Sequence, residues 1–290
     1  MALPEFDFTH ATDLKHALSL LDKHGDEAKL AGGTTVFLTM ARQGLILSPH
    51  VVGISRLKEL KYIKKENGQL RIGALTTHRD IEKCDILQKG PMSILSQMEA
   101  DVASVQIRNR GTVGGNLAYA EPTCDPPPVF LALDASVEIC SAAGKRTVPI
   151  GSFYKGLYYP DLNANEIITE VSMPVLPDHY SGYYYKFTQR KGMDKPFVGV
   201  AAVVCVENNV FKDVRIAVGA VAEIPFRATQ AEESLKGQKV SPEAIEQAGK
   251  LAAQGVECIP DLRCSEEYKL KVLPLIVKRA INKAIEAGKK

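Results

Sequence analysis

Two glycine-rich turns are the parts of this sequence whose residue types and spacing best suit ligand binding. The first turn reads AGGTT at residues 31–35, and the second reads GTVGGN at residues 111–116. Glycine lets backbone amides approach an anion closely, and amides at the start of a helix donate with the helix dipole behind them. Thr34 and Thr35 add hydroxyl donors, which suits the first turn to a pyrophosphate. The alternative is that these residues only cap a helix.

A lone aspartate follows the second turn in an unusual setting. Asp125 lies nine positions after Asn116, inside PTCDPPP, where the prolines restrict the backbone. A carboxylate held in this way can accept hydrogen bonds from ligand hydroxyls. The alternative is a turn residue ahead of a buried helix, since proline suits the first helical turn and PPPVFLALDA has the composition of such a helix. Two anion sites and a rigid acid exceed what one phosphate needs and favour a long, bent dinucleotide.

Neither turn matches the standard nucleotide fingerprints. GGTT fits neither G-x-G-x-x-G of dinucleotide-binding Rossmann domains nor G-x-x-x-x-G-K-[ST] of the P-loop proteins. The sequence therefore disfavours a nicotinamide Rossmann domain and a P-loop kinase.

The elements around the first turn predict a small parallel α/β unit. LKHALSLLDKHG has helical spacing, with Thr12 able to cap its start, and a short strand from Ala28 leads into the turn. A second helix then carries Val36 and Phe37 toward a core, and VVGI at 51–54 is a further strand. Short strands joined by helical crossovers are typical of parallel pairing.

After residue 55 the patterns become mainly antiparallel. Asn67-Gly68 between two apolar runs is the strongest short signal for a hairpin, and Ala143-Gly144 is a second turn between strands. EIITEVSMP predicts another strand. Beyond residue 181 three strand-like runs precede two helices, the first beginning at Ser241-Pro242.

The sequence thus predicts an α+β protein of two domains, as its 290 residues also favour. Residues 1–176 would form a two-part ligand-binding domain, with the parallel α/β unit at about 1–55 and a mainly antiparallel α+β unit at 56–176. Residues 177–290 would form a C-terminal domain with a three-stranded antiparallel sheet and helices.

Composition restricts the partners and the compartment. The 36 basic and 34 acidic residues give a formal charge of +2 without a basic block, so nucleic acid is not expected as a partner. No run approaches the roughly 20 apolar residues of a membrane span, and the first ten residues lack the pattern of a signal peptide. We therefore expect a cytoplasmic location.

Six cysteines occur without a C-x-x-C pair, which predicts reduced thiols and no metal site. Cys258 and Cys264 are the nearest pair, but their spacing fits no common metal motif. Cys124 is expected to be a small packed thiol beside Asp125.

Taken together, AGGTT, IRNRGTVGGNLA and AEPTCDPPPVFLALDA resemble the FAD-binding medium subunit of the molybdenum hydroxylases, a family that includes xanthine dehydrogenase and aerobic carbon monoxide dehydrogenase. GALTTH, YYKFTQRKG, AAVVCV and SEEYKLKVLPLIVKRAINKA extend the resemblance along the chain. It implies an electron-transfer flavoprotein that takes electrons from the 2Fe-2S clusters of a small subunit and passes them to an external acceptor. A large subunit carries the molybdopterin, and a dimer of heterotrimers is the assembly expected.

The resemblance also implies noncovalent FAD, no catalytic side chain and no metal in this chain. The positions that it assigns to FAD binding are Leu30, Ala31, Gly32, Gly33, Thr34, Thr35, Val36, Phe37, Thr112, Val113, Gly114, Gly115, Asn116, Asp125, Ile168 and Lys186. Ile168 would contact FAD through its backbone. Lys186 would lie near the isoalloxazine ring, where a cation stabilises negative charge on the reduced ring. The alternative for Lys186 is a solvent-facing lysine on a strand.

Two departures from the family pattern bear on these expectations. Some members carry an Asp-Tyr whose ring covers the flavin, whereas this chain reads GMDKPFVG, with Phe197 as the candidate to fill that space. The four-cysteine insertion that holds a 4Fe-4S cluster in the 4-hydroxybenzoyl-CoA reductases is absent. Two other functions stay open: a stand-alone flavin reductase or oxidase similar to the enolpyruvyl-sugar reductases, and a nonenzymatic nucleotide-binding or assembly module.

Overall fold

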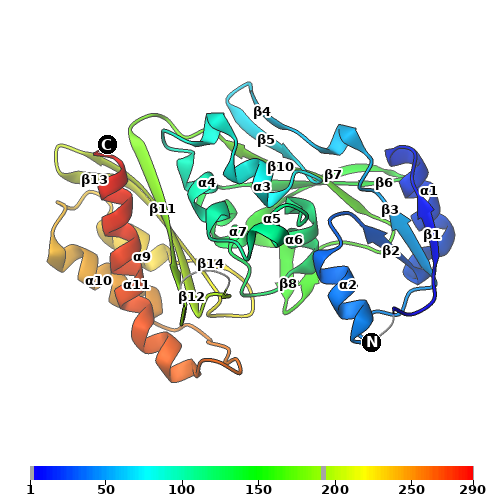
Figure 1. Ribbon diagram of the computed structural model, residues 1–290. Coiled ribbons are helices and arrows are strands. Elements are labelled where there is room, and N and C mark those ends of the chain that lie inside the picture. The colour runs from blue at the N-terminus through cyan, green and yellow to red at the C-terminus, as the bar shows by residue number, and fades with distance from the viewer. Residues whose placement is uncertain (1–2, 191–193, 290) are drawn as a thin grey trace.

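The computed structural model of the chain describes residues 3–190 and 194–289. Its N-terminal part, the blue end of the chain in Figure 1, is a parallel sheet crossed by two helices. Its strands pair in the order β1-β3-β2, all parallel. The elements in chain order are β1 (Asp7–His10), α1 (Leu14–His24), η1 (Gly25–Glu27), β2 (Ala28–Ala31), α2 (Thr35–Arg42) and β3 (His50–Gly53).

The predicted parallel α/β unit is therefore confirmed, with β1 as an addition. The prediction that Thr12 caps α1 is wrong, because Asp13 holds that position. The Asp13 carboxylate accepts a hydrogen bond of 2.8 Å from the backbone N–H of His16. Aspartate and threonine are both good N-caps, so the sequence alone leaves their order open.

An antiparallel sheet follows and forms the middle of the molecule. Its strands pair in the order β4-β5-β10-β6-β7. They are β4 (Ile63–Glu66), β5 (Gln69–Gly73), β6 (Ser136–Ser141), β7 (Gly144–Pro149) and β10 (Ile167–Pro174). Asn67 and Gly68 join β4 to β5 with φ of 50° and 74°, the left-handed pair that a tight hairpin turn needs. Both predicted hairpins are confirmed.

Short helices connect these strands, and several of them pack against one another in the middle of the molecule. In chain order they are η2 (Lys58–Leu60), α3 (His78–Glu82), η3 (Asp85–Leu87), α4 (Ser93–Ala100), α5 (Val105–Arg108), α6 (Val113–Tyr119), α7 (Pro126–Ala132) and α8 (Ile150–Phe153). A small hairpin of β8 (Tyr154–Gly156) and β9 (Tyr159–Pro160) leads toward β10.

The C-terminal part is an antiparallel sheet, green to yellow in Figure 1, backed by helices, of which α10 and α11 are orange to red. It consists of β11 (Tyr180–Phe187), β12 (Val198–Glu207), β13 (Val210–Gly219), β14 (Phe226–Arg227), α9 (Thr229–Leu235), α10 (Pro242–Ala253) and α11 (Glu266–Ala287). The three predicted strands are present. The fourth strand, β14, has two residues, too few to carry a detectable period, and α9 was likewise not predicted.

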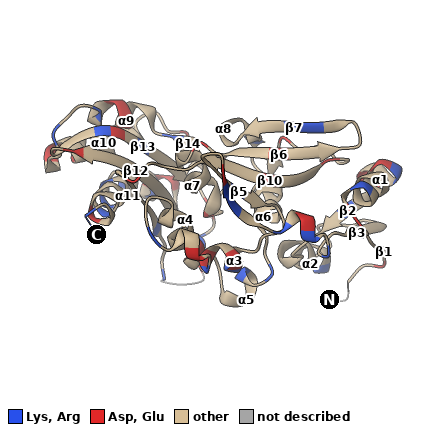
Figure 2. Ribbon diagram, turned by 90° about the horizontal axis from the view of Figure 1, so that it is seen from above, with Lys and Arg blue, Asp and Glu red and all other residues tan. Residues whose placement is uncertain are grey.

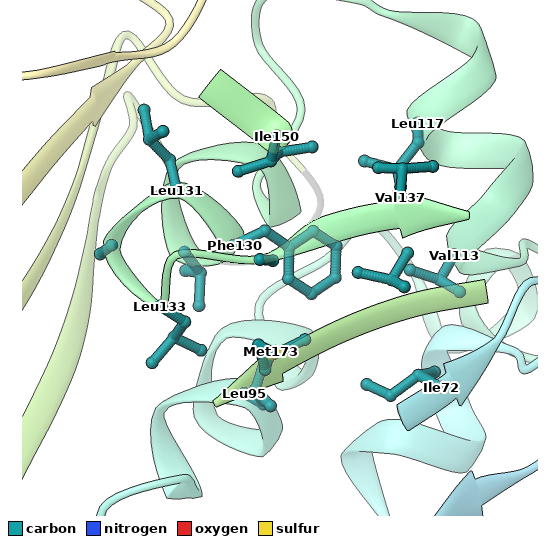
Figure 3. Close-up of a cluster of buried hydrophobic side chains, with 14 of the residues drawn as sticks. Ile72, Leu95, Val113, Leu117, Phe130, Leu131, Leu133, Val137, Ile150 and Met173 are labelled. Carbon is teal, nitrogen blue, oxygen red and sulfur yellow. The ribbon is translucent and has the colours of Figure 1, made fainter. Parts of the chain in front are cut away.

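The sheet β11–β14 is buried on both faces. Val200 and Val204 of β12 belong to the cluster with α10 and α11, whereas Ala201 and Val203 belong to the cluster around Phe130. Figure 3 shows Phe130 of α7 among side chains of β6, β10 and α4. One apolar core thus joins the middle sheet to the C-terminal sheet, which holds the loops between them in place.

Charged residues of both signs lie interspersed over the chain in the view of Figure 2. Within the described residues, no helix combines the length and apolar character needed to cross a membrane.

Candidate functional site

The first glycine turn joins β2 to α2 and leaves the start of that helix without a cap. Thr34 has a left-handed φ of 63°, and its hydroxyl donates to the carbonyl of Gly33 at 2.8 Å rather than accepting from the helix. Among the described residues, the backbone N–H groups of Thr35, Val36 and Phe37 have no hydrogen-bond acceptor. These residues are partly exposed. The turn therefore presents free donors at the positive end of a helix dipole.

The second glycine turn joins α5 to α6 and is satisfied internally. The hydroxyl of Thr112 accepts from the N–H of Gly115 at 3.2 Å. The N–H groups of Val113, Gly114 and Asn116 donate to Thr76, Ala74 and Thr112 at 3.0, 2.9 and 2.9 Å. Residues 112–114 are buried, and Gly115 alone is exposed. The backbone amides expected to hold a cofactor here thus already have acceptors.

The two turns lie against each other, although about 80 residues separate them in the sequence. A Cβ on Gly33 would overlap the carbonyl of Arg110, and a Cβ on Gly32 would lie 3.1 Å from Leu75 Cδ2. Figure 1 shows α2 and α6 side by side at this junction. Glycine at 33 therefore permits the contact between the turns, beside its role in exposing amides.

One buried polar atom of the second turn has no hydrogen-bond partner among the described residues. This atom is Oδ1 of Asn116. An unpaired buried acceptor costs about 1–3 kcal/mol. A ligand donor at this position would remove that cost.

Asp125 and Lys186 form a buried ion pair that crosses from the middle of the chain to β11. Lys186 Nζ lies 2.8 Å from Asp125 Oδ2 and also donates to the carbonyl of Asp101 at 2.7 Å. The hydroxyl of Tyr184 donates to Asp125 Oδ1 at 2.8 Å. Both charged side chains are 7% exposed. Lys186 is therefore not the solvent-facing lysine of the alternative interpretation.

Burial raises the pKa of Asp125 to about 6, although the ammonium of Lys186 and the hydroxyl of Tyr184 act in the opposite direction. Asp125 is also the N-cap residue of α7, followed by proline at the first helical positions, without a side-chain hydrogen bond to the helix. The local turn predicted for Asp125 is thus present, and its carboxylate faces Lys186 rather than its own helix.

Ile168 lies in β10 in the core, opposite Ile139 of β6 and next to a register shift at Thr169. The carbonyl of Thr169 accepts from Ala74, whose own carbonyl accepts from Gly114. Thr169, the residue after Ile168, is thereby linked to the second turn through two consecutive backbone hydrogen bonds. Of the residues predicted for the first turn, Leu30 and Ala31 end β2, residues 32–34 form the loop, and residues 35–37 begin α2.

Four residues near these positions were not singled out from the sequence. Glu121 is buried, and its carboxylate forms an ion pair of 2.8 Å with the ammonium of Lys195. The hydroxyl of Thr123 also donates to the carboxylate of Glu121. Tyr184 holds Asp125, as described above. Lone charges in loops give no sequence signal for pairing across 74 positions, which is why the ion pair of Glu121 and Lys195 escaped prediction.

Cys124 lies between Glu121 and Asp125, with its sulfur 4.0 Å from Glu121 Oε2. Burial first, and the neighbouring carboxylates next, raise the pKa of its thiol well above the usual value. All six cysteines are free of disulfides. The packed-thiol interpretation of Cys124 agrees with this environment.

Phe197 is 7% exposed and packs edge-on against Phe187 at 6.1 Å, with the guanidinium of Arg263 over its ring at 5.4 Å. Gly192 and Met193 of the GMDKPFVG run lie outside the described residues. Phe197 is thus part of the packing between β11 and the loop before α11.

A buried histidine, His78, is hydrogen-bonded to the start of the second turn. The backbone N–H of His78 donates to the carbonyl of Gly111 at 3.0 Å, and its Nδ1 lies 2.7 Å from Glu99 Oε2. Burial disfavours the charged imidazole, but the carboxylate of Glu99 outweighs it and raises the pKa of His78. GALTTH, which contains His78, thereby contributes to the site through the turn that it supports.

Comparisons with known proteins match the whole chain. Residues 4–176 match the model described as FAD binding domain in molybdopterin dehydrogenase, and residues 183–284 match CO dehydrogenase flavoprotein C-terminal domain. The chain is 31% identical to the glyceraldehyde dehydrogenase medium chain of Sulfolobus acidocaldarius, covering 96% of this chain and 97% of that one. It is also 31% identical to the xanthine dehydrogenase FAD-binding subunit of Escherichia coli O157:H7, covering 98% of both.

A solved structure shows the same fold. The chain superposes on a chain of carbon monoxide dehydrogenase from Hydrogenophaga pseudoflava with a TM-score of 0.95 and 31% sequence identity, covering 99% of each chain.

Proposed function

The chain belongs to the family of FAD-binding medium subunits of molybdenum hydroxylases, and from this premise we propose that it holds FAD noncovalently between the two glycine turns and the Asp125–Lys186 pair. It is the flavoprotein component of a molybdopterin-dependent dehydrogenase. FAD, when bound, takes up electrons from a donor and releases them to an acceptor.

The uncapped start of α2 is the observation that carries this placement. Three consecutive amides without acceptors lie at the start of α2, a helix of eight residues. They suit the two negative charges of a pyrophosphate. The other predicted contacts in this turn, from Leu30 to Thr34, lie on the strand and loop that lead to those amides.

The second turn would contribute side chains and shape rather than amides. Asn116 Oδ1 is buried without a partner and is available to a ligand hydroxyl or amine. Gly115 is the exposed residue of the turn, so a ligand can approach its backbone closely. We propose that Thr112 holds these two residues in place by accepting from their N–H groups, and that Val113 and Gly114 fix the turn through their hydrogen bonds to Thr76 and Ala74.

The Asp125–Lys186 pair would place a positive charge at the junction of the middle sheet and β11. Its ammonium is held on two sides, by the carboxylate of Asp125 and the carbonyl of Asp101, so it cannot swing freely. A fixed cation at such a site stabilises negative charge on a bound ligand without reorganising. Ile168 would contribute backbone contact from β10, as the family resemblance implies.

The complex is also part of the proposal. Relatives of this chain are named as medium chains or FAD-binding subunits, and we propose that it assembles with a large molybdopterin-binding subunit and a small 2Fe-2S subunit as a dimer of heterotrimers. The division into domains at residues 176 and 177, like the cytoplasmic location, remains a prediction.

FAD binding by the purified full-length chain tests the cofactor and its site. We expect about one FAD per chain, removable by denaturation, and much weaker binding of FMN, because FMN lacks the pyrophosphate bridge that α2 would hold. Gly115→Asp should abolish FAD binding while the circular dichroism spectrum stays unchanged. Gly151→Asp, at an exposed glycine of α8, is the matched control. A folded chain that stays colourless after incubation with FAD rules out the proposal, and equal binding of FMN rules out the role of α2.

Co-expression with a large molybdopterin-binding subunit and a small 2Fe-2S subunit from the same source tests the assembly. Recovery of all three chains in equal amounts supports the complex, whereas a medium chain that elutes alone at every concentration contradicts it.

A further inference from the structure

Three potential metal ligands converge at one end of the C-terminal sheet. A ring nitrogen of His179, the sulfur of Cys205 and a carboxylate oxygen of Glu207 all lie within 4.8 Å of one another. We infer that these side chains bind a divalent metal ion of the zinc class. The sequence analysis did not find this cluster, because the ligands lie at positions 179, 205 and 207 without a metal-binding spacing.

The strand register explains why the three residues meet. Tyr180, the first residue of β11, pairs with Cys205 of β12, which places His179 beside the same end of β12. Cys205 and Glu207 are two positions apart in β12, and their ligand atoms lie within 4.8 Å of each other although the register with β13 shifts between Cys205 and Val206. His179 lies within a turn closed by the hydrogen bond of 3.0 Å from the N–H of Tyr180 to the carbonyl of Pro177.

The ligand atoms are free to bind a metal. His179 and Glu207 are exposed, and neither side chain has a hydrogen bond or ion pair to any other described residue. Cys205 is 2% exposed, so its sulfur would form the inner wall of the site. Zinc bonds of about 2.3 Å to sulfur and about 2.0 Å to nitrogen require closer ligands than 4.8 Å. The two exposed side chains can supply that closure by changing rotamer.

The ligand types select the class of metal. Thiolate, imidazole and carboxylate together suit Zn²⁺ and its analogue Co²⁺, whereas Mg²⁺ and Ca²⁺ prefer sites made of oxygen atoms only. Three protein ligands leave a fourth position for water. The carboxylate of Asp213, opposite Cys205, is not offered as the fourth ligand, because it already accepts from Tyr180 and Arg215 at 3.2 Å each.

The site is separate from the proposed FAD site. Lys186, at the far end of β11, is six residues along the strand from Tyr180, which is about 20 Å at the rise of an extended strand. A bound metal would tie the turn before β11 to the end of β12 and so stabilise the entry of the chain into the C-terminal sheet.

Spectroscopy with Co²⁺ tests the site on the full-length chain after removal of metals with a chelator. We expect about one Co²⁺ per chain, a near-ultraviolet charge-transfer band that reports a thiolate ligand, displacement of that band by Zn²⁺, and a higher Tm with Zn²⁺ present. His179→Ala and Glu207→Gln change exposed side chains and should weaken Co²⁺ binding by at least about tenfold. Cys205→Ser and Cys205→Ala should each remove the band.

Two variants control for metal binding elsewhere. The rings of His24 and His50 lie 3.8 Å apart and are the competing imidazole pair, so His50→Ala should leave the charge-transfer band intact. Cys84→Ser, at a partly exposed thiol outside the cluster, should do the same. Absence of the band in the folded wild-type chain overturns the inference, as does a band that survives in His179→Ala and Glu207→Gln at unchanged Co²⁺ affinity.

Discussion

The two glycine turns look alike in sequence and differ in how their backbone is satisfied. The first, residues 31–37, starts α2 with three amides that have no acceptor, and its threonine hydroxyl turns away from the helix. The second, residues 111–116, caps α6 with Thr112 and gives its amides acceptors in residues 74–76 and 112. A glycine-rich turn before a helix is therefore no proof of an anion site. The presence or absence of a cap separates the two roles.

Glycine itself serves packing in both turns. A Cβ on Gly33 would overlap the backbone of Arg110, and a Cβ on Gly114 would lie 2.7 Å from the Cβ of Ala74. The contact at Gly33 brings the first turn against the second, in which Asn116 Oδ1 is buried without a hydrogen-bond partner among the described residues. The comparison thus assigns donation to the first turn and support to the second.

The largest effect should come from the buried charge that anchors the region after the second turn. Lys186→Met leaves the carboxylate of Asp125 buried with Tyr184 as its remaining donor, and we expect a loss of about 3–5 kcal/mol in the free energy of unfolding at pH 7. Urea denaturation measures it. Lys29→Met, at an exposed lysine of β2 beside the first turn, should change stability by less than about 0.5 kcal/mol.

Adding Asp125→Asn to Lys186→Met should recover part of that loss, because no unpaired charge then stays buried. An equal loss in the single and double variants would show that the packing of Lys186, rather than its charge, stabilises this region.

A charge placed in the first turn should separate ligand binding from stability. Thr35→Glu puts a carboxylate at the positive end of α2, which leaves stability unchanged or raises it by about 0.3–1 kcal/mol. The same charge would repel a pyrophosphate, so FAD affinity should fall at least about 100-fold, or about 2.7 kcal/mol. Equilibrium dialysis and thermal unfolding give the two quantities. Thr39→Glu, one turn further along α2, is the control, and unchanged FAD affinity in Thr35→Glu would remove the first turn from the site.

A change to the cap of the second turn should have the opposite profile. Thr112→Val removes the acceptor of the Gly115 N–H and should cost about 1–2 kcal/mol in stability. FAD affinity, measured on the folded fraction, should change by less than about tenfold, since the amides of this turn bind protein carbonyls. Thr112→Ser keeps the cap and should be close to wild type. A larger loss of affinity than of stability would mean that the second turn also donates to FAD.

The last expected effect is a pH dependence that belongs to Asp125. Its pKa of about 6 in the folded chain lies above the usual value near 3.8, so the folded state binds more protons between these values. Stability from this group is therefore present below about pH 4 and is lost as the pH rises toward 6. Unfolding experiments on the FAD-free wild type and on Asp125→Asn should show a difference in stability that changes over this window and is flat above about pH 7. A flat difference throughout would place the titration elsewhere.

Local signals in the sequence predicted most elements of the fold. The Asn67-Gly68 hairpin, the Ser241-Pro242 helix start and the strand of EIITEV all appear as expected, because a left-handed turn, a cap and an alternating pattern depend on neighbouring residues. The two-residue strand β14 and the cap of α1 by Asp13 were not predicted from the sequence. β14 is defined by its hydrogen bonds to β13, and Thr12 and Asp13 are adjacent residues that can both cap a helix.

The residue types of the two turns, the lone Asp125 and the family resemblance were available from the sequence alone. Their division of roles was decided by the tertiary structure. Which amides stay free depends on whether Ala74 and Thr76 approach the second turn. Whether Asp125 faces a ligand or Lys186 depends on how α7 packs against β12, the strand that pairs with β11. Likewise, His179, Cys205 and Glu207 meet only through the register of β11 with β12. Local propensity acts over a few residues, whereas these contacts join positions 26 to 61 residues apart and exist only once the sheets have packed.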